Sequence, residues 1–285
     1  MEKIGLVLEG GGMRGAYTAG VLDWLLENEL YFDYVSGISS GAMYAAMYML
    51  KKRETLHSAA VNVAADPRNI GIKAIRAERT IVGYEFLYNE VTQNLDFPLE
   101  EIDKIDGDIE IGVYDMEEQK TIWANKHQIA KNPKFIQAAC VLPIFGKQVK
   151  INGKHYMDGG ITTMIPIEQS IAAGCTKHMV VTTKSSDYVR KEQNFFQKHL
   201  LRFVYRKFPQ LIHDFEARKT VYYEERERID ALVEEGNGLY MFPTQELGVS
   251  RFGGDAVRFQ QLFDIARADC EARRDEIVAF YQSTK

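Results

Sequence analysis

Two short apolar runs, each ending in glycine and each followed by a helical pattern, occupy the first 50 residues of the chain. Ile4 to Leu8 is the first run and leads into Gly10-Gly11-Gly12, while Phe32 to Ser36 is the second and ends at Gly37. Apolar runs of this length that stop at glycine are typical of buried strands. Strand, helix, strand, helix predicts an α/β protein in which helices cover the faces of a sheet.

The rest of the chain continues this architecture and then changes in composition. Ile109 to Val113 has the period of a strand, Asn152-Gly153 is a strong hairpin signal, and His178 to Thr183 is a further predicted strand. After Thr183 the chain becomes aromatic and basic, and then charged and rich in helix-forming residues. We therefore expect an α/β domain over residues 3–185, which the motifs below make the candidate catalytic domain, and a mainly helical C-terminal region, a cap or an appendage, over residues 186–285.

Composition and charge narrow the class of protein. Of the 285 residues, 46% are hydrophobic and 26% are charged, and the formal net charge is −5. These values are ordinary for a globular protein, and without a basic bias we expect no nucleic acid partner. Three widely separated cysteines predict reduced thiols rather than a disulfide framework or a zinc site. No apolar run fits a signal peptide or approaches the roughly 20 residues of a membrane span. We expect a cytoplasmic protein, and any contact that it makes with a membrane to be peripheral.

Gly37-Ile38-Ser39-Ser40-Gly41 is a G-x-S-x-G pattern where the second predicted strand gives way to a helix. In hydrolases this pattern holds a serine exposed on a sharp strand-to-helix turn, and small neighbours let the backbone make that turn. The helix N-terminus directs free N–H groups at the same place. The pattern predicts Ser39 as a nucleophile, although it also occurs by chance in glycine- and serine-rich turns.

A second glycine-rich turn, Gly10-Gly11-Gly12-Met13-Arg14-Gly15, directly follows the first predicted strand. Consecutive glycines expose backbone N–H groups, which can stabilise the oxyanion of an acyl-transfer intermediate. The same geometry can hold a phosphate, and Gly10, Gly12 and Gly15 also satisfy the G-x-G-x-x-G dinucleotide pattern. This loop alone does not decide between the two.

Asp158 is the third signal, because it follows the hairpin strand and precedes Gly159 and Gly160. An isolated Asp-Gly pair is usually a turn, but here it accompanies the two other glycine-rich turns. A dinucleotide-binding fold requires an acidic residue at the end of its second strand, where this chain has Gly37-Ile38-Ser39. An α/β-hydrolase normally places its nucleophile after several strands, whereas Ser39 follows two. The three signals together favour a different acyl hydrolase.

These segments resemble the patatin-like phospholipase family. The matching residues are Gly-Gly-Gly-Met-Arg-Gly at 10–15, Gly-Ile-Ser-Ser-Gly at 37–41, Asp-Gly-Gly at 158–160 and the lead-in Ala-Ala-Cys-Val-Leu-Pro at 138–143. Order and spacing agree over residues 3–185, and the chain looks most like bacterial members with an extra C-terminal region. One departure is Gly160, where many members have alanine.

The resemblance implies a three-layer α/β/α fold with a central, mostly parallel sheet, and lipid acyl hydrolase activity of the phospholipase A or esterase type without metal or cofactor. It implies a Ser-Asp dyad, in which Ser39 is the nucleophile and Asp158 the base. The oxyanion loop then corresponds to Gly10, Gly11, Gly12 and Arg14. The flanking motif residues are Gly15, Gly37, Gly41, Gly159 and Gly160.

Several alternatives stay open at this point. The chain could be a carboxylesterase for small soluble esters, or a nucleotide-binding module that uses residues 10–15 for phosphate. A catalytic triad would require histidine, but His155, three residues before Asp158, points to the opposite face of its strand. The stretch from Lys198 to Phe208 fits a cap helix or an interfacial helix on anionic lipid. Buried packing, or the lining of an acyl pocket, explains the cluster Met43, Tyr44, Met47, Tyr48 and Met49.

Overall fold

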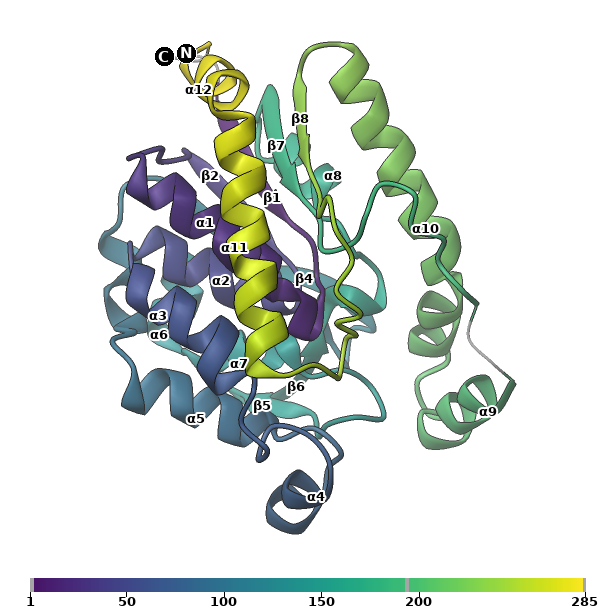
Figure 1. Cartoon of the computed structure of the whole chain (residues 1–285). Coiled ribbons are helices and arrows are strands. Elements are labelled where there is room, and N and C mark those ends of the chain that lie inside the picture. Colours follow the sequence, from purple (N-terminus) through teal and green to yellow (C-terminus); the bar gives the residue numbers. More distant parts are fainter. Residues whose placement is uncertain (1–2, 193–194, 284–285) are drawn as a thin grey trace.

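One mixed sheet forms the centre of the molecule in a computed structural model that describes residues 3–192 and 195–283 (Figure 1). Within these residues eight strands lie in the order β5 (Val149–Ile151), β6 (Lys154–Asp158), β3 (Asp108–Asp115), β2 (Tyr34–Gly37), β1 (Ile4–Leu8), β7 (Lys177–Val181) and β8 (Gly238–Met241), with β4 (Lys120–Asn125) paired to β3. Neighbours from β3 through β2, β1 and β7 to β8 are parallel, whereas β4, β5 and β6 run antiparallel to their partners. The sheet is mostly parallel, as predicted, and the hairpin predicted at Asn152-Gly153 joins β5 to β6.

Helices cover both faces of the sheet. One face carries α1 (Gly15–Glu27), α2 (Ser40–Met49) and α11 (Ala256–Ala272), and the other carries α10 (Pro209–Glu234) with the short α8 (Ile167–Ala172). Successive strand residues point to opposite faces, so Leu6 and Leu8 of β1 belong to the buried cluster of the first face and Val7 belongs to that of the second. The predicted three-layer α/β/α fold is confirmed.

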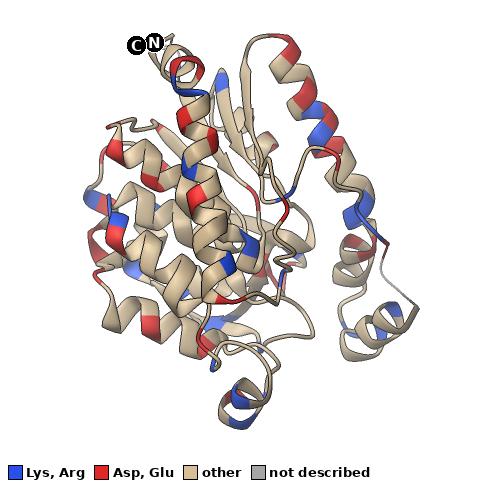
Figure 2. Cartoon of the chain, viewed as in Figure 1, with Lys and Arg blue, Asp and Glu red and all other residues tan. Residues whose placement is uncertain are grey.

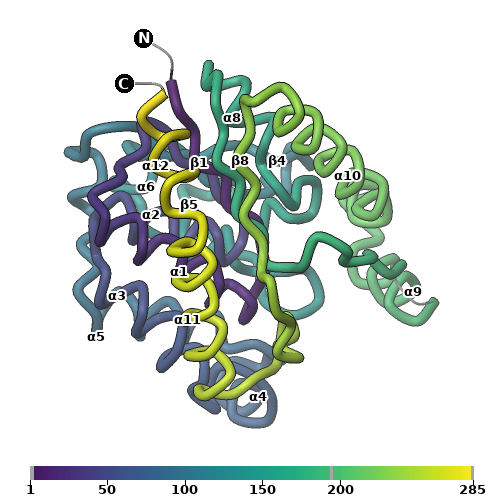
Figure 3. The backbone as a smooth tube through the Cα atoms, turned by 45° about the horizontal axis from the view of Figure 1, so that its top comes forward, coloured from purple at the N-terminus to yellow at the C-terminus, as the bar shows by residue number. Residues whose placement is uncertain are grey.

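The C-terminal region is mainly helical and is built into this same sheet. β8 pairs in parallel with β7, and α11 then runs along the outside of α1, as Figure 3 shows in yellow and purple. Gly20 permits this approach, because a Cβ there would lie 2.3 Å from the carbonyl oxygen of Phe263. The region therefore adds to all three layers, while its boundary near residue 185 stays a prediction.

The remaining helical elements lie between or beside those already named. They are η1 (Gly12–Arg14), α3 (Arg53–Ser58), the π-helical η2 (Ala59–Val63), α4 (Ile72–Glu78), α5 (Tyr84–Asn94), η3 (Leu99–Lys104), α6 (Lys126–Lys131), α7 (Lys134–Cys140), η4 (Gly159–Ile161), α9 (Phe195–Val204) and α12 (Arg274–Gln282). Acidic and basic residues are interspersed along α10 and α11 (Figure 2). Across the described ranges, every helix is too short or too polar to cross a membrane.

Candidate active site

Two strands meet end to end beside β3 and bring distant residues together. β4 pairs with β3 from Glu110 to Asp115, whereas β2 pairs with β3 up to Ile111 and β6 pairs from Val113 onward. Since a strand has two edges, β2 and β6 share the edge that β4 leaves free. Gly37 lies opposite Ile111 and Asp158 lies opposite Val113. The carboxyl ends of β2 and β6 therefore face each other, which places Asp158 beside the turn that follows Gly37.

Ser39 lies on a strained turn between β2 and α2. Its backbone dihedrals are φ 57° and ψ −129°, a combination that residues with side chains rarely adopt. Close packing enforces the turn, because a Cβ on Gly37 would lie 2.6 Å from the carbonyl oxygen of Gly41, and a Cβ on Gly41 would lie 2.7 Å from that of Leu8. The two glycines of the G-x-S-x-G pattern thus hold Ser39 at the N-terminus of α2.

Asp158 is completely buried, and its carboxylate is held in one orientation. Its Oδ1 accepts a hydrogen bond from the N–H of Gly160 at 2.7 Å, while no group in the described ranges completes a hydrogen bond to Oδ2. Burial raises the pKa of Asp158 to about 6, and the Gly160 amide, the Ser39 hydroxyl, Arg218 and Arg251 oppose this rise. A carboxylate with a pKa near neutrality beside a serine is suited to proton transfer.

Ser39 and Asp158 line one cavity of about 310 Å³. Backbone of the first glycine-rich turn forms part of its wall, through Gly10, Gly11 and Gly12. Three arginines of the C-terminal region complete the wall: Arg190, Arg218 and Arg251. The fold thus brings the two predicted catalytic residues and the three predicted loop glycines into a single site.

The glycine-rich turn uses part of its own backbone for support. The N–H of Gly10 donates to the carbonyl oxygen of Met164 at 3.2 Å, and that of Gly11 donates to Oγ of Ser40 at 3.1 Å. Gly12 and Ser40 are the first residues of η1 and α2. Their N–H groups have no hydrogen-bond acceptor among the residues described. Two backbone donors therefore stay free beside Ser39.

Arg14 does not line this cavity. Its guanidinium lies 6.0 Å from the ring centroid of Tyr188 and lines a separate cavity that includes Lys184. Gly15 has a packing role, since a Cβ there would lie 2.7 Å from the ring of Tyr44. Of the predicted oxyanion loop, the backbone of residues 10–12 faces Ser39 and the Arg14 side chain points elsewhere.

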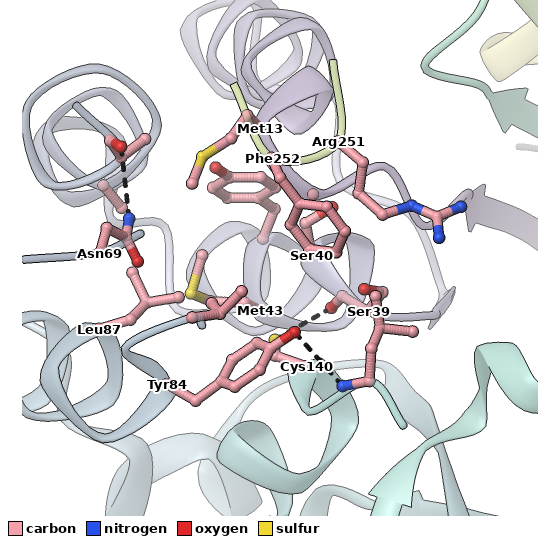
Figure 4. A pocket seen from close by; sticks show the side chains of 16 residues that line it. Met13, Ser39, Ser40, Met43, Asn69, Tyr84, Leu87, Cys140, Arg251 and Phe252 are labelled. Atoms are coloured by element: carbon pink, nitrogen blue, oxygen red, sulfur yellow. Dashed lines mark hydrogen bonds between the residues drawn. The ribbon is translucent and has the colours of Figure 1, made fainter. Parts of the chain in front are cut away.

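A second, mainly apolar cavity of about 560 Å³ opens from Ser39 (Figure 4). Its apolar lining comes from several elements and includes Met13, Met43, Val82, Tyr84, Leu87, Leu142 and Phe252. The methionine and tyrosine cluster of α2 divides here: Met43 and Tyr44 line the cavity, whereas Met47 is fully buried and lies outside its lining. Met43 and Tyr44 thus line an apolar cavity and Met47 is buried packing, while the role of the cavity as an acyl pocket stays a prediction.

The described histidines lie outside both cavities. His155 makes a hydrogen bond with Glu117 at 2.8 Å near the start of β6, and His57 makes one with Gln260 at 2.7 Å. Burial lowers the pKa of His178 to about 4, and its Nδ1 shares a hydrogen bond with Ser170. No described histidine is placed to act as a base for Ser39.

Sequence reasoning missed the three cavity arginines. Arg190 precedes α9, Arg218 lies on α10, and Arg251 lies in the loop between β8 and α11. No motif links them, and the C-terminal region holds other arginines that pair with carboxylates at the surface, such as Arg202 with Glu216. Only the folded structure shows which arginines line the cavity and which pair with carboxylates at the surface.

Two different family models match the two parts of the chain. A family model described as Patatin-like phospholipase matches residues 6–171, and one described as Domain of unknown function (DUF6363) matches residues 208–282. The Uncharacterized protein YjjU of Escherichia coli (strain K12) is 22% identical over 198 residues, which cover 68% of this chain and 55% of that protein. The Putative patatin-like phospholipase domain-containing protein M110.7 of Caenorhabditis elegans is 47% identical over 47 residues, covering 16% of this chain and 4% of that protein.

Among solved structures, VipD from Legionella pneumophila is similar, with a TM-score of 0.40 and 14% identity over 94% of this chain and 67% of that chain. The chain thus spans about half of the first curated relative and a small part of the second. The Patatin-like phospholipase match covers more than half of this chain and includes both Ser39 and Asp158. The chain belongs to the patatin-like phospholipase family, a membership that suggests lipid acyl hydrolase activity.

Proposed function

We propose that the chain is a serine hydrolase that cleaves carboxylic esters of lipids, with Ser39 as nucleophile and Asp158 as general base. The observation that carries this proposal is the cavity they share: a serine on a strained turn faces a buried carboxylate whose other oxygen is already fixed. Family membership supports the reaction class, and the geometry supports the roles of the two residues.

In the first half-reaction Oγ of Ser39 attacks the ester carbonyl carbon, and Oδ2 of Asp158 accepts the hydroxyl proton. The bond from Gly160 to Oδ1 keeps Oδ2 available for this transfer. With a pKa of about 6, Asp158 is ionised at neutral pH and is a stronger base than an ordinary aspartate. The same proton then passes to the leaving oxygen, so that the alcohol departs and an acyl-serine remains.

In the second half-reaction a water molecule takes the place of the departed alcohol. Asp158 accepts a proton from this water as its oxygen attacks the acyl-serine carbonyl. Collapse of the intermediate returns the proton to Oγ of Ser39 and releases the carboxylic acid. The dyad is regenerated without a net change in protonation.

The free N–H groups of Gly12 and Ser40 are the donors that we assign to the oxyanion. Gly10 and Gly11 support the loop instead, because their N–H groups bind Met164 and Ser40. Because the N–H groups of Gly10 and Gly11 are already bonded, the glycine-rich turn has few backbone donors for a phosphate, which argues against a nucleotide site built on residues 10–15. In this proposal the apolar cavity beside Ser39 receives the acyl chain, since its lining suits a hydrocarbon.

We also infer peripheral contact with a lipid surface through α4 and α9. Ile72 on α4 is 68% exposed, and Phe195 and Phe203 on α9 are 77% and 70% exposed. Basic residues accompany them on both helices (Figure 2), which suits an anionic bilayer. The opposite side of α9 packs on the catalytic domain, where Leu201 is buried and the hydroxyl of Tyr205 accepts a hydrogen bond from the backbone.

Ester hydrolysis by matched variants tests the catalytic proposal. We expect wild type to cleave p-nitrophenyl esters, and Ser39→Ala and Asp158→Asn each to lose at least about 10³-fold in kcat/KM. Ser186→Ala and Asp264→Asn, both exposed, are the controls and should keep the wild-type rate. Near-normal activity of Asp158→Asn would show that another group serves Ser39. If p-nitrophenyl butyrate is still cleaved faster than p-nitrophenyl palmitate when the palmitate is presented on micelles, the carboxylesterase alternative is favoured.

A further inference from the structure

Three arginines from three separate segments converge on the cavity that holds Ser39 and Asp158. All of them come from outside the Patatin-like phospholipase match, and Arg218 and Arg251 lie within the domain of unknown function at residues 208–282. The backbone also ties this region to the glycine-rich turn, because the N–H of Met13 donates to the carbonyl oxygen of Arg251 at 3.1 Å. The C-terminal region thus completes the wall of the site.

These arginines are three cations packed close together, and Asp158 and Glu225 are the acidic groups that act on Arg218. None of the three forms an ion pair with a carboxylate in the described ranges. Arg218 is only 7% exposed, and its Nε is buried without a hydrogen-bond partner. Burial lowers the pKa of Arg218 and of Arg251, and neighbouring arginines lower both pKa values further.

Neither nearby carboxylate can satisfy the cluster. Asp158 directs Oδ1 to Gly160 and, in the proposed reaction, Oδ2 to Ser39. Glu225 on α10 accepts hydrogen bonds from the N–H groups of Met164 and Ile165 at 3.0 to 3.2 Å, so its oxygens are engaged with backbone. Buried guanidinium groups are costly unless an anion pairs with them. An anion with several oxygens fits the forked donors of arginine best.

We propose that Arg190, Arg218 and Arg251 form a subsite for a phosphate group of the substrate, next to the ester that Ser39 attacks. The subsite rests on the proposed hydrolase function and assigns selectivity to the C-terminal region. Arg251 and Leu142 line both this cavity and the apolar cavity, so the phosphate and the acyl chain lie on two sides of Ser39. The substrate class is a carboxylic ester that carries a phosphate monoester or diester.

A matched pair of soluble substrates tests the subsite. The hexanoyl esters of glycerol and of glycerol 3-phosphate share one ester and differ in the phosphate. We expect wild type to prefer the phosphate ester in kcat/KM, and Arg218→Gln and Arg251→Gln each to reduce this preference by about tenfold or more. Arg258→Gln, which removes an exposed arginine of α11 paired with Asp255, should keep the wild-type preference.

The ratio of kcat/KM for the phosphate ester to kcat/KM for the glycerol ester distinguishes a loss of selectivity from a general loss of activity of the Ser39–Asp158 dyad. If the arginines only adjust the pKa of Asp158, both substrates slow together and the preference is unchanged, which would overturn the subsite. A wild-type preference near one would overturn it as well. Arg218→Lys and Arg251→Lys retain the charge without the planar fork and should give intermediate preferences, which also guards against variants that fail to fold.

Binding of inorganic phosphate tests the subsite without catalysis. Calorimetry on Ser39→Ala should detect phosphate, and adding Arg218→Gln should weaken its binding by about tenfold or more. If no ester is hydrolysed but phosphate binds through these arginines, the hydrolase proposal fails and the anion site stands. If esters are hydrolysed but phosphate neither binds nor competes, the anion site fails alone.

A final comparison identifies the source of the phosphate. Vesicles of phosphatidylglycerol present it as a lipid head group, and hexanoyl glycerol 3-phosphate presents it on a small soluble ester. Faster hydrolysis on vesicles assigns the subsite to a head group, and faster hydrolysis of the soluble ester assigns it to a small phosphate ester. No preference for either over its neutral counterpart would overturn the proposal.

Discussion

Asp158 is the residue whose surroundings matter most to the chemistry. Its pKa is about 6 in the folded chain, against an ordinary value of 3.8, and burial is the main cause. Because the folded value is the higher one, folding favours the protonated form. The stabilisation present below about pH 4 is therefore lost as the pH rises through about 6. At neutral pH the ionised carboxylate of Asp158 therefore destabilises the folded chain.

The pH dependence of hydrolysis follows from this pKa. For a neutral ester we expect kcat/KM to rise with pH, to be half-maximal near pH 6 and to level off above it, because only ionised Asp158 accepts a proton. In Arg251→Gln the midpoint should move upward, since Arg251 holds the pKa of Asp158 down. A midpoint near pH 4 in wild type would mean that Asp158 is not the titrating base.

The same pKa predicts that Asp158→Asn is more stable than wild type at neutral pH. Asp158→Asn removes the ionised carboxylate, so at pH 7.5 the free energy of unfolding should increase by roughly 2 to 3 kcal/mol. The gain should become small toward pH 4, where Asp158 is protonated in the folded state and about half protonated in the unfolded state. Thermal or urea unfolding at the two pH values measures it, with Asp264→Asn as the exposed control. An equal or lower stability of Asp158→Asn at pH 7.5 would contradict the buried-charge explanation.

At the scale of elements, two features create the site. The turn between β2 and α2 strains Ser39, and the end-to-end meeting of β2 and β6 beside β3 brings Asp158 to it. Both depend on backbone that approaches backbone, which explains why glycines frame the site. The elbow is therefore rigid and intolerant of side chains.

Gly37→Ala tests this rigidity. Its Cβ would lie 2.6 Å from the carbonyl oxygen of Gly41, so α2 must shift, and we expect a loss of several-fold or more in kcat/KM together with about 2 kcal/mol of stability. The control is Gly174→Ala, at φ 82° with open space around it, which measures backbone strain alone at about 1 kcal/mol. Equal effects of the two variants would mean that the elbow is not tightly packed.

At the scale of the whole molecule, the sequence predicts local structure but not which distant segments come into contact. The strands, the elbow at Ser39 and the hairpin before Asp158 were predictable, because glycine turns and apolar periods act within a few residues. The convergence of Arg190, Arg218 and Arg251 was not, because it depends on how α10 and the loop before α11 pack. The same holds for Arg14, whose place in the motif does not reveal where its side chain points.

The exposed aromatic residues of α9 lead us to expect that the whole molecule attaches to lipid vesicles. Phe195→Ser combined with Phe203→Ser should reduce flotation with phosphatidylglycerol vesicles, because these exposed rings would no longer enter the bilayer surface. Hydrolysis of a soluble ester should stay at the wild-type rate. Val257→Ser, which replaces an exposed apolar residue of α11, is the matched control. Unchanged flotation would exclude α9 as a lipid contact.

Covalent labelling of Ser39 tests the central claim most directly. A fluorophosphonate should modify wild type once, at the peptide that contains Ser39, as read by mass spectrometry. Labelling should be absent from Ser39→Ala and slowed by at least about 10²-fold in Asp158→Asn, because the probe requires an activated hydroxyl. Fast labelling of Asp158→Asn, or modification of a residue other than Ser39, would contradict the proposed dyad.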